Sequence, residues 1–260
     1  MTSSLPMYAA GSAAGEALWN AIAEQLPMPG VPAKLSQPTD LLAHWLDPQL
    51  LLSQTCGYPL THALAGQVQL VGTFIYTAPG CDGLHYRSQL VCRNANAGLP
   101  LAEFRGRTVA YNAEDSQSGY HSLRALVAPL ARNGRFFGQA VVTGSHRASV
   151  DSVRSGQADL AAIDCVTWAL LLRDHPEVVR GVQVCGHTAS TPGLPLITSL
   201  QTSPEVLAAL RRALRDAMHA PALVEARATL LIQDFVELVL SDFDAIPQME
   251  TCANSTGYRL

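Results

Sequence analysis

The chain has 260 residues, of which 48% are hydrophobic and 15% charged, and its formal net charge is −4. This composition is typical of a folded globular protein and excludes a disordered or polyionic chain. The basic residues are scattered, which argues against a nucleic-acid partner, and no apolar run approaches the roughly 20 residues needed to span a bilayer.

Short β-like runs alternate with helical patterns along the chain, which predicts α/β layering around a mainly parallel sheet. A helix is expected after most of the strands, with Pro27 and Gly156 as two of the helix ends. The predicted strands are 5–9, 50–53, 68–76, 84–93, 107–111, 136–142, 160–163, 182–184 and 196–199.

The last predicted helix has the clearest start signal. Ser203 suits the N-cap, Pro204 suits the first helical position, and Glu205 complements the helix dipole. An apolar stripe from Leu207 to Met218 predicts a buried face. A further amphipathic stretch around residues 230–240 completes the chain.

Hydroxyl, amide and imidazole side chains gather in the loops that follow the strands. In open α/β sheets the ligand lies at the carboxyl ends of the strands, where helix N-termini attract anions. The loop 115–120 offers two hydroxyl groups, an amide and a glycine that lets a ligand approach the backbone. Its candidate ligand contacts are Ser116, Gln117, Ser118 and Gly119. The alternative is that Ser116 or Ser118 only caps the following helix.

Two further loops have a similar layout. Ser145 and His146 follow the next strand, and a histidine near a helix start can bind an anion or be structural. The loop 54–58 adds Thr55 and Tyr58 as candidates.

Asp164 ends an apolar strand, where a buried aspartate must be hydrogen-bonded or paired. It is predicted either to cap the next helix or to contact a ligand. The sequence contains no P-loop, no G-x-S-x-G elbow and no H-E-x-x-H pattern. We therefore expect no catalytic site, no cofactor and no metal.

The six cysteines include no C-x-x-C pair, and most lie in apolar segments. This pattern favours buried free thiols in a reducing compartment. A Cys81–Cys92 bridge across a hairpin stays open as an alternative.

The combination of Ser116–Tyr120, Thr143–His146 and Gly156–Asp164 resembles the phosphate/phosphite/phosphonate-binding family of ABC importers. The resemblance implies the α/β fold of class II periplasmic binding proteins, with two Rossmann-like lobes joined by two hinge crossings. It implies that residues 1–83 and 196–260 form lobe I and that residues 84–195 form lobe II. Such proteins close around their ligand like a hinged trap.

Carried over residue by residue, the resemblance implies that a small oxyanion is bound in the inter-lobe cleft. Tyr86 matches the family's aromatic position on the hinge strand, and Asp164 matches the acidic position that meets the amine in aminophosphonate binders. Gln117 stands where the family more often has threonine. The ligand contacts that the resemblance implies are Ser116, Gln117, Ser118, His146, Tyr86 and Asp164, and the loop pattern adds Gly119, Ser145, Thr55 and Tyr58.

The function that the resemblance implies is capture of phosphate, phosphite or phosphonate for ABC-type uptake or sensing, without chemical conversion. The expected protein is a monomer whose partner is an ABC transporter permease. The family implies the periplasm, whereas Met1–Tyr8 does not resemble a signal peptide and the free cysteines favour the cytoplasm. The alternative is a cofactor-free enzyme on the same scaffold, with Asp164, His146 or Cys165 as acid/base groups.

Overall fold

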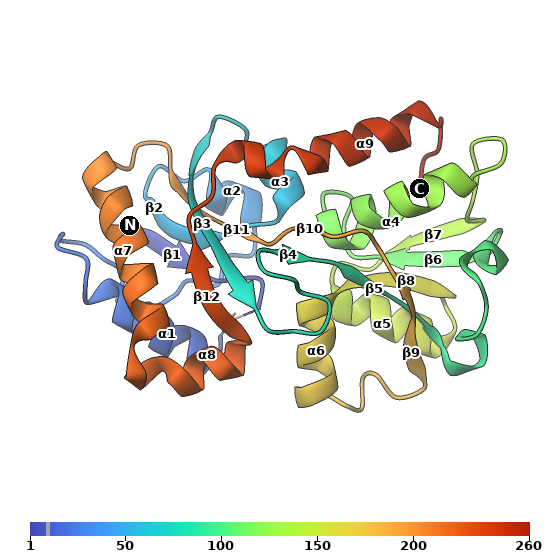
Figure 1. Cartoon of the computed structure of the whole chain (residues 1–260), viewed down its shortest axis with the longest axis horizontal. Coiled ribbons are helices and arrows are strands. Elements are labelled where there is room, and N and C mark those ends of the chain that lie inside the picture. Colours follow the sequence, from blue (N-terminus) through green and yellow to red (C-terminus); the bar gives the residue numbers. More distant parts are fainter. Residues whose placement is uncertain (9–10) are drawn as a thin grey trace. The chain divides into compact units, whose positions relative to one another are not determined.

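The computed structural model describes residues 1–8 and 11–260 and divides the chain into two units (Figure 1). Unit 1 consists of Met1–Thr77 and Pro192–Phe243, and unit 2 consists of Ala78–Thr191 and Asp244–Leu260. The chain therefore passes between the units three times, one more than the sequence predicted. The added passage carries the C-terminal tail into unit 2, where the sequence-based division placed it in lobe I.

Unit 1 is built on a five-stranded mixed sheet. The parallel pair β1–β2 forms one side, β11 runs antiparallel to both β2 and β3, and β12 runs antiparallel to β3. The prediction of a mainly parallel sheet is wrong for this unit, because a strand buried on both faces is apolar whatever its direction. The strand order is β1 (Thr2–Ser4), β2 (Leu50–Gln54), β11 (Pro195–Ser199), β3 (Val68–Tyr76) and β12 (Ile232–Val236).

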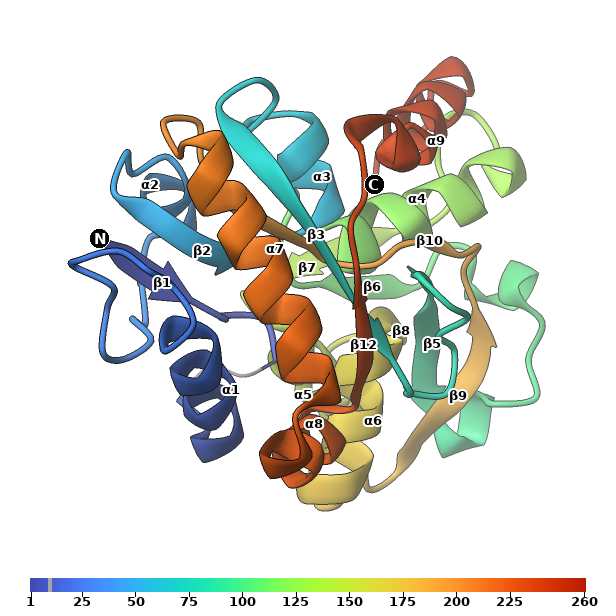
Figure 2. The ribbon, with the colours of Figure 1, turned by 60° about the vertical axis from the view of Figure 1, so that its left-hand side comes forward.

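In the described part of unit 1, five helices accompany this sheet, and α7 lies alongside β3 and β12 (Figure 2). As predicted, Pro204 is the first residue of α7 and the Ser203 hydroxyl accepts the Val206 N–H at 3.4 Å. Their bounds are α1 (Ala13–Ala23), α2 (Leu41–Trp45), α3 (Gly57–Thr61), α7 (Pro204–His219) and α8 (Val224–Leu230).

The ends of the chain differ most from the sequence prediction. The first strand is Thr2–Ser4 and not 5–9, and residue 9 lies outside the described residues. The amphipathic stretch 230–240 contains β12, followed by the 3-10 turn Leu240–Phe243. It does not complete the chain, because the helix α9 (Ala245–Ser255) follows in unit 2.

Gly72 sets the fit between β3 and β12. A Cβ there would lie 2.3 Å from the carbonyl oxygen of Val236 and 2.6 Å from the ring of Phe235. Because that carbonyl belongs to the paired strand, it cannot rotate away. We expect Gly72→Ala to lower the free energy of unfolding by about 3 kcal/mol in urea titration. Gly98→Ala is the control, since a Cβ on Gly98 meets no atom within 4 Å; equal losses in the two variants would contradict the account.

Unit 2 contains a second five-stranded mixed sheet. The strands β7, β6 and β8 run parallel, while β5 runs antiparallel to both β8 and β9. The mainly parallel prediction therefore holds only for the strands that carry the candidate loops. The strand order is β7 (Gln139–Val142), β6 (Thr108–Tyr111), β8 (Leu160–Asp164), β5 (Ser88–Arg93) and β9 (Val182–His187).

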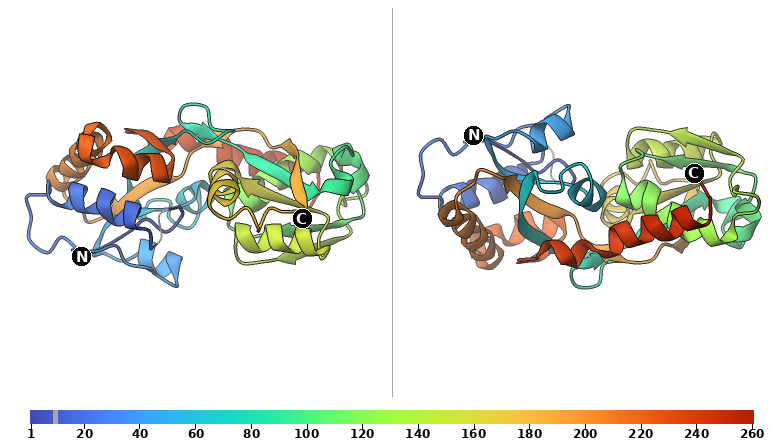
Figure 3. Two further views of the ribbon diagram at one scale, coloured as in Figure 1. Left: turned by 90° about the horizontal axis from the view of Figure 1, so that it is seen from below. Right: turned by 90° about the horizontal axis from the view of Figure 1, so that it is seen from above.

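Helices cover both faces of the unit 2 sheet. Along β8, Leu160 and Ala162 belong to the core beneath α4 (Ser122–Val127), while Ala161 and Ile163 belong to the core beneath α5 and α6. α9 lies along α4 (Figure 3), and the Arg124 guanidinium on α4 donates to the Tyr258 carbonyl in the C-terminal tail. These contacts explain why the tail belongs to unit 2.

The remaining elements are short or lie at the site. They are α5 (His146–Ser155), α6 (Cys165–Asp174), β4 (His85–Tyr86), β10 (Thr191–Pro192), the π-type turn η3 (Gln117–His121) and the 3-10 turns η1 (Asn94–Asn96), η2 (Leu101–Phe104), η4 (Ala128–Leu130), η5 (Pro221–Leu223) and η6 (Leu240–Phe243). Over the described residues, none of the helices has both the length and the apolar character required to cross a membrane.

Candidate functional site

Three loops of unit 2 converge because β6, β7 and β8 are parallel neighbours whose carboxyl ends share one edge of the sheet. They bring together Ser118, His146 and Asp164, which are far apart in the sequence. The Nε2 atom of His146 lies 3.1 Å from the Ser118 hydroxyl and 3.3 Å from Oδ2 of Asp164. This cluster joins three of the residues that the sequence nominated as ligand contacts.

The neutral His146 ring has one hydrogen and two acceptors beside it, the Asp164 carboxylate and the Ala162 carbonyl, and the charged acceptor forms the stronger hydrogen bond. An ionised carboxylate only accepts hydrogen bonds, so we assign the imidazole hydrogen to Nε2, the nitrogen that faces Asp164. That N–H then donates to the Ser118 oxygen, and the Ser118 O–H is left to donate elsewhere. Asp164 thus fixes the tautomer of His146, and His146 in turn makes the Ser118 O–H point away from the imidazole.

Burial lowers the pKa of His146 below its ordinary value, and the opposing effect of the Asp164 charge is smaller. The unfolded chain therefore binds a proton more readily than the folded one, and the stability of the ligand-free protein falls as the pH drops below about 6.5. We expect the melting temperature to decrease between pH 7.5 and 5.5 and His146→Gln to reduce this decrease.

A second histidine contributes with the same sign, since burial also lowers the pKa of His44. His44→Gln is therefore the matched control and should reduce the pH dependence separately. An unchanged pH dependence in His146→Gln would show that His146 is not buried as a neutral ring.

The turn that carries Ser118 is a single π-type turn, Gln117–His121, of the kind often found at functional sites. The Ser116 hydroxyl caps it by accepting the Gly119 N–H at 3.0 Å, so the capping alternative is confirmed for Ser116. The Ser88 hydroxyl donates to the carbonyl of Ser118 at 2.8 Å and holds the turn from β5. A Cβ on Gly119 would lie 1.9 Å from Oδ1 of Asn112, which explains the glycine.

The side chains of two other predicted residues already have partners within unit 2. The amide of Gln117 is fully buried and donates to the Ser122 hydroxyl at 3.2 Å and to the Met249 sulfur at 3.7 Å. The Ser145 hydroxyl caps α5 by accepting the Ala148 N–H at 3.1 Å. Gln117 is therefore placed to offer a ligand its backbone and not its side chain.

Asp164 is the N-cap of α6, as one of the two sequence alternatives predicted. Its Oδ1 accepts the N–H groups of Val166 at 3.0 Å and Thr167 at 2.8 Å. Oδ2 faces His146, and only 4% of the side chain is exposed. Contact between Asp164 and a ligand stays a prediction.

The other predicted contacts lie elsewhere in the chain. Tyr86 is buried on β4 in unit 2, and Thr55 and Tyr58 lie in unit 1 around the start of α3. Among the described residues, the buried Thr55 hydroxyl has no hydrogen-bond partner. The Tyr58 ring stacks on His62 with centroids 3.7 Å apart.

Sequence reasoning missed two residues that contact the Gln117–His121 turn. Ser88 donates a hydrogen bond to it, and Asn112 packs against Gly119. A signal for Ser88 was present, because a serine that is buried in an otherwise apolar strand needs a hydrogen-bond partner. Nothing in the sequence marks Asn112, whose role depends on its closeness to Gly119.

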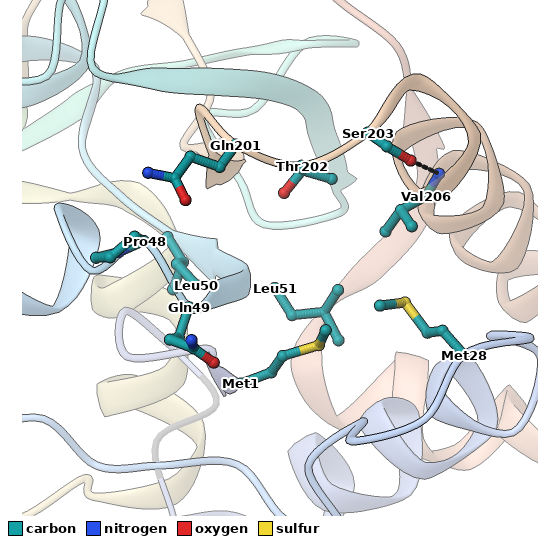
Figure 4. A pocket seen from close by; sticks show the side chains of 10 residues that line it. All are labelled: Met1, Met28, Pro48, Gln49, Leu50, Leu51, Gln201, Thr202, Ser203 and Val206. Carbon is teal, nitrogen blue, oxygen red and sulfur yellow. Dashed lines mark hydrogen bonds between the residues drawn. The ribbon is translucent and has the colours of Figure 1, made fainter.

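Unit 1 contains a pocket of about 290 Å³ beside β2 and the start of α7 (Figure 4). None of the predicted ligand contacts lines it. Its wall mixes apolar and polar side chains, and the Ser203 hydroxyl accepts the Val206 N–H. Its lining residues are Met1, Met28, Pro48, Gln49, Leu50, Leu51, Gln201, Thr202, Ser203 and Val206.

No group of three or more His, Cys, Asp or Glu side chains within residues 1–8 and 11–260 is arranged to hold a metal ion. The candidate site instead offers neutral hydrogen-bond donors around Ser118. Such donors suit the oxygens of a small anion.

Residues 46–243 match the sequence profile of the family described as "ABC transporter, phosphonate, periplasmic substrate-binding protein". The chain belongs to this family. The resemblance noted in the sequence is thereby confirmed. No curated protein sequence matches the chain.

Solved structures show the same fold at low sequence identity. PhnD1 from Prochlorococcus marinus in complex with methylphosphonate is 13% identical with a TM-score of 0.79, covering 97% of this chain and 98% of that one. The binding protein component of an ABC phosphonate transporter from Pseudomonas aeruginosa is 18% identical with a TM-score of 0.78, covering 98% and 87%.

A third similar structure, XAC2383 from Xanthomonas citri bound to ATP, is 15% identical with a TM-score of 0.72, covering 98% and 97%. The fold is that of the two-lobed class II periplasmic binding proteins, as predicted. As a member of the family, this chain is a solute-binding protein of the ABC phosphonate transporter type and not an enzyme.

Proposed function

We propose that this substrate-binding protein captures a small phosphorus oxyanion through the Gln117–His121 turn of unit 2. A phosphonate is the first candidate for this ligand. The observation that carries the proposal is the Ser118–His146–Asp164 cluster, with Nε2 of His146 3.1 Å from the Ser118 hydroxyl. The family description and the methylphosphonate bound to PhnD1 support this class of ligand.

The chemistry of the turn suits such a ligand. A phosphonate presents three oxygens that accept hydrogen bonds, and the Ser118 hydroxyl is turned to donate. The N–H groups at the start of a helix have no acceptor within it and carry a partial positive charge, so the start of this turn adds donors. Fixed neutral donors bind an anion without the strong desolvation cost of a buried lysine or arginine.

Asp164 acts in this proposal as a positioning residue. Its two oxygens are engaged with the start of α6 and with His146, and little of its side chain is exposed. The ligand contacts proposed for unit 2 are the Ser118 hydroxyl, Tyr86 and the backbone of Gln117 and Ser118. The N–H groups of Ser116 and Gly119 already donate to the Ala113 carbonyl and to the Ser116 hydroxyl, and His146 acts through Ser118.

Thr55 and Tyr58 remain proposed ligand contacts of unit 1. The Thr55 hydroxyl supports this role, because a buried hydroxyl without a protein partner needs another one. We further propose that the protein works as a monomer with an ABC transporter permease.

Titration of the dialysed protein with methylphosphonate, followed by ³¹P NMR, tests the proposal. We expect one bound resonance that saturates at one equivalent and a ligand that is recovered unchanged after the protein is denatured. A spectrum in which the free resonance neither shifts nor broadens would contradict phosphonate binding. A new phosphorus product would contradict the solute-binding role.

A further inference from the structure

Two cysteines far apart in the sequence face each other beside the candidate site. The Sγ atoms of Cys81 and Cys165 lie 3.5 Å apart, although 84 positions separate the residues. Both belong to unit 2. The hairpin bridge between Cys81 and Cys92 that the sequence left open is not present in the structure, where the Cys81 sulfur faces Cys165 instead.

The turn that carries Cys81 is held against Cys165 by several contacts. The side-chain amide of Gln89 donates to the carbonyl of Pro79 at 3.2 Å, and the Cys81 N–H donates to the carbonyl of Ala78 at 2.9 Å. Gly80 allows the approach, because a Cβ there would lie 2.9 Å from the Cβ of Cys165. These contacts hold the Cys81 sulfur next to the Cys165 sulfur.

The two thiols differ in character. Cys165 is fully buried at the first position of α6, while Cys81 is half-buried. The two sulfurs lie within hydrogen-bond distance, and we assign Cys81 as the donor because Cys165 stands at the start of α6. This hydrogen bond lowers the pKa of Cys165 and raises that of Cys81. A helix N-terminus also favours a thiolate. Cys165 is thus the better nucleophile, and Cys81 is the accessible sulfur.

We infer that Cys81 and Cys165 form a reversible disulfide when the protein meets a low-molecular-weight disulfide such as oxidised glutathione. In the first step the accessible Cys81 thiol gives its hydrogen-bonded proton to the Cys165 sulfur and attacks the oxidant as a thiolate, which forms a mixed disulfide; the departing glutathione takes that proton from Cys165 and leaves as a thiol. In the second step the Cys165 thiolate attacks the Cys81 sulfur and displaces the second glutathione as its thiolate. The two protein thiols lose two electrons and two protons, and one glutathione disulfide becomes two thiols.

The bridge fixes the start of α6 to the segment 78–82, which is the first part of unit 2 after the chain leaves unit 1. Because Asp164 is adjacent to Cys165, the bridge also fixes the carboxylate that holds His146. An oxidising compartment such as the bacterial periplasm would close this bridge, and a reducing one would keep it open.

Peptide mapping of the whole protein tests the inference. The protein is reduced, freed of reductant, incubated with oxidised glutathione, alkylated, digested and analysed by mass spectrometry. We expect a cross-linked peptide pair joining Cys81 and Cys165 and a rise in melting temperature of about 5–10 °C that dithiothreitol reverses. Alkylation of both cysteines, or a stable glutathione adduct on Cys81, would overturn the inference.

Two variants serve as controls. The double variant Cys92→Ser/Cys185→Ser removes another pair of adjacent cysteines in unit 2 and should keep the cross-link and the temperature rise. In that pair, burial raises the pKa of Cys185 to about 12. Cys81→Ser should lose both. The peptide map of the unmodified chain decides the question even if a variant fails to fold, and it does not depend on phosphonate binding.

Discussion

Phosphonate affinity is expected to fall about 10- to 100-fold when Ser118 is replaced by alanine, because a hydrogen bond to a charged group contributes about 1.5–3 kcal/mol. The hydroxyl removed is the one whose proton His146 turns outward, with Nε2 of His146 3.1 Å from the serine oxygen. Isothermal titration with methylphosphonate measures the loss. The fold should persist, since the capping hydroxyl of the turn belongs to Ser116.

The matched control is Ser203→Ala in unit 1. Ser203 caps α7, so its removal should lower the free energy of unfolding by about 1 kcal/mol and leave phosphonate affinity unchanged. If Ser118→Ala bound methylphosphonate as tightly as the unmodified protein, the Gln117–His121 turn would not be the anion site.

Asp164→Asn is expected to weaken binding of every phosphorus oxyanion by about 10-fold, because hydrogen bonds to a charged ligand are lost when their donor is turned away. Asparagine can still cap α6 through its oxygen, where Asp164 accepts two N–H groups. Its NH₂ group, however, would face Nε2 of His146 and favour the tautomer without a hydrogen there. The Ser118 proton would then point to His146 and not to the ligand.

A comparison of two ligands separates this positioning role from an amine contact. Methylphosphonate and 2-aminoethylphosphonate should lose affinity equally in Asp164→Asn if the carboxylate acts through His146. A loss confined to the aminophosphonate would mean that Asp164 meets the ligand amine, as the family resemblance implied. An unchanged melting temperature of the ligand-free variant confirms that α6 remains capped.

Local signals in the sequence predicted much of unit 2. The apolar runs gave the positions of β6 and β8, and Gly156, with a φ of 83°, ends α5 where the sequence predicted it. Because parallel strands end at one edge, the loops after β6, β7 and β8 were expected to meet, and Ser118, His146 and Asp164 do so.

Features that depend on distant contacts were not predictable. The antiparallel directions of β5, β11 and β12 leave no trace in the apolar pattern of a buried strand. The partner of Cys81 is 84 positions away and is selected by the turn around Gly80. The sequence predicted that the Gln117 amide contacts a ligand, but this amide donates hydrogen bonds to Ser122 and Met249 within unit 2.

A thermal-shift comparison of the dialysed protein with methylphosphonate, phosphate, phosphite and sulfate tests the central claim most directly. At a hundredfold its dissociation constant, a ligand stabilises the folded protein by about 2.7 kcal/mol, or about 5–10 °C for a chain of this size. We predict a shift of this size with a phosphorus oxyanion and none with sulfate. Equal shifts with all four anions, or no shift with any of them, would contradict a site selective for phosphorus oxyanions.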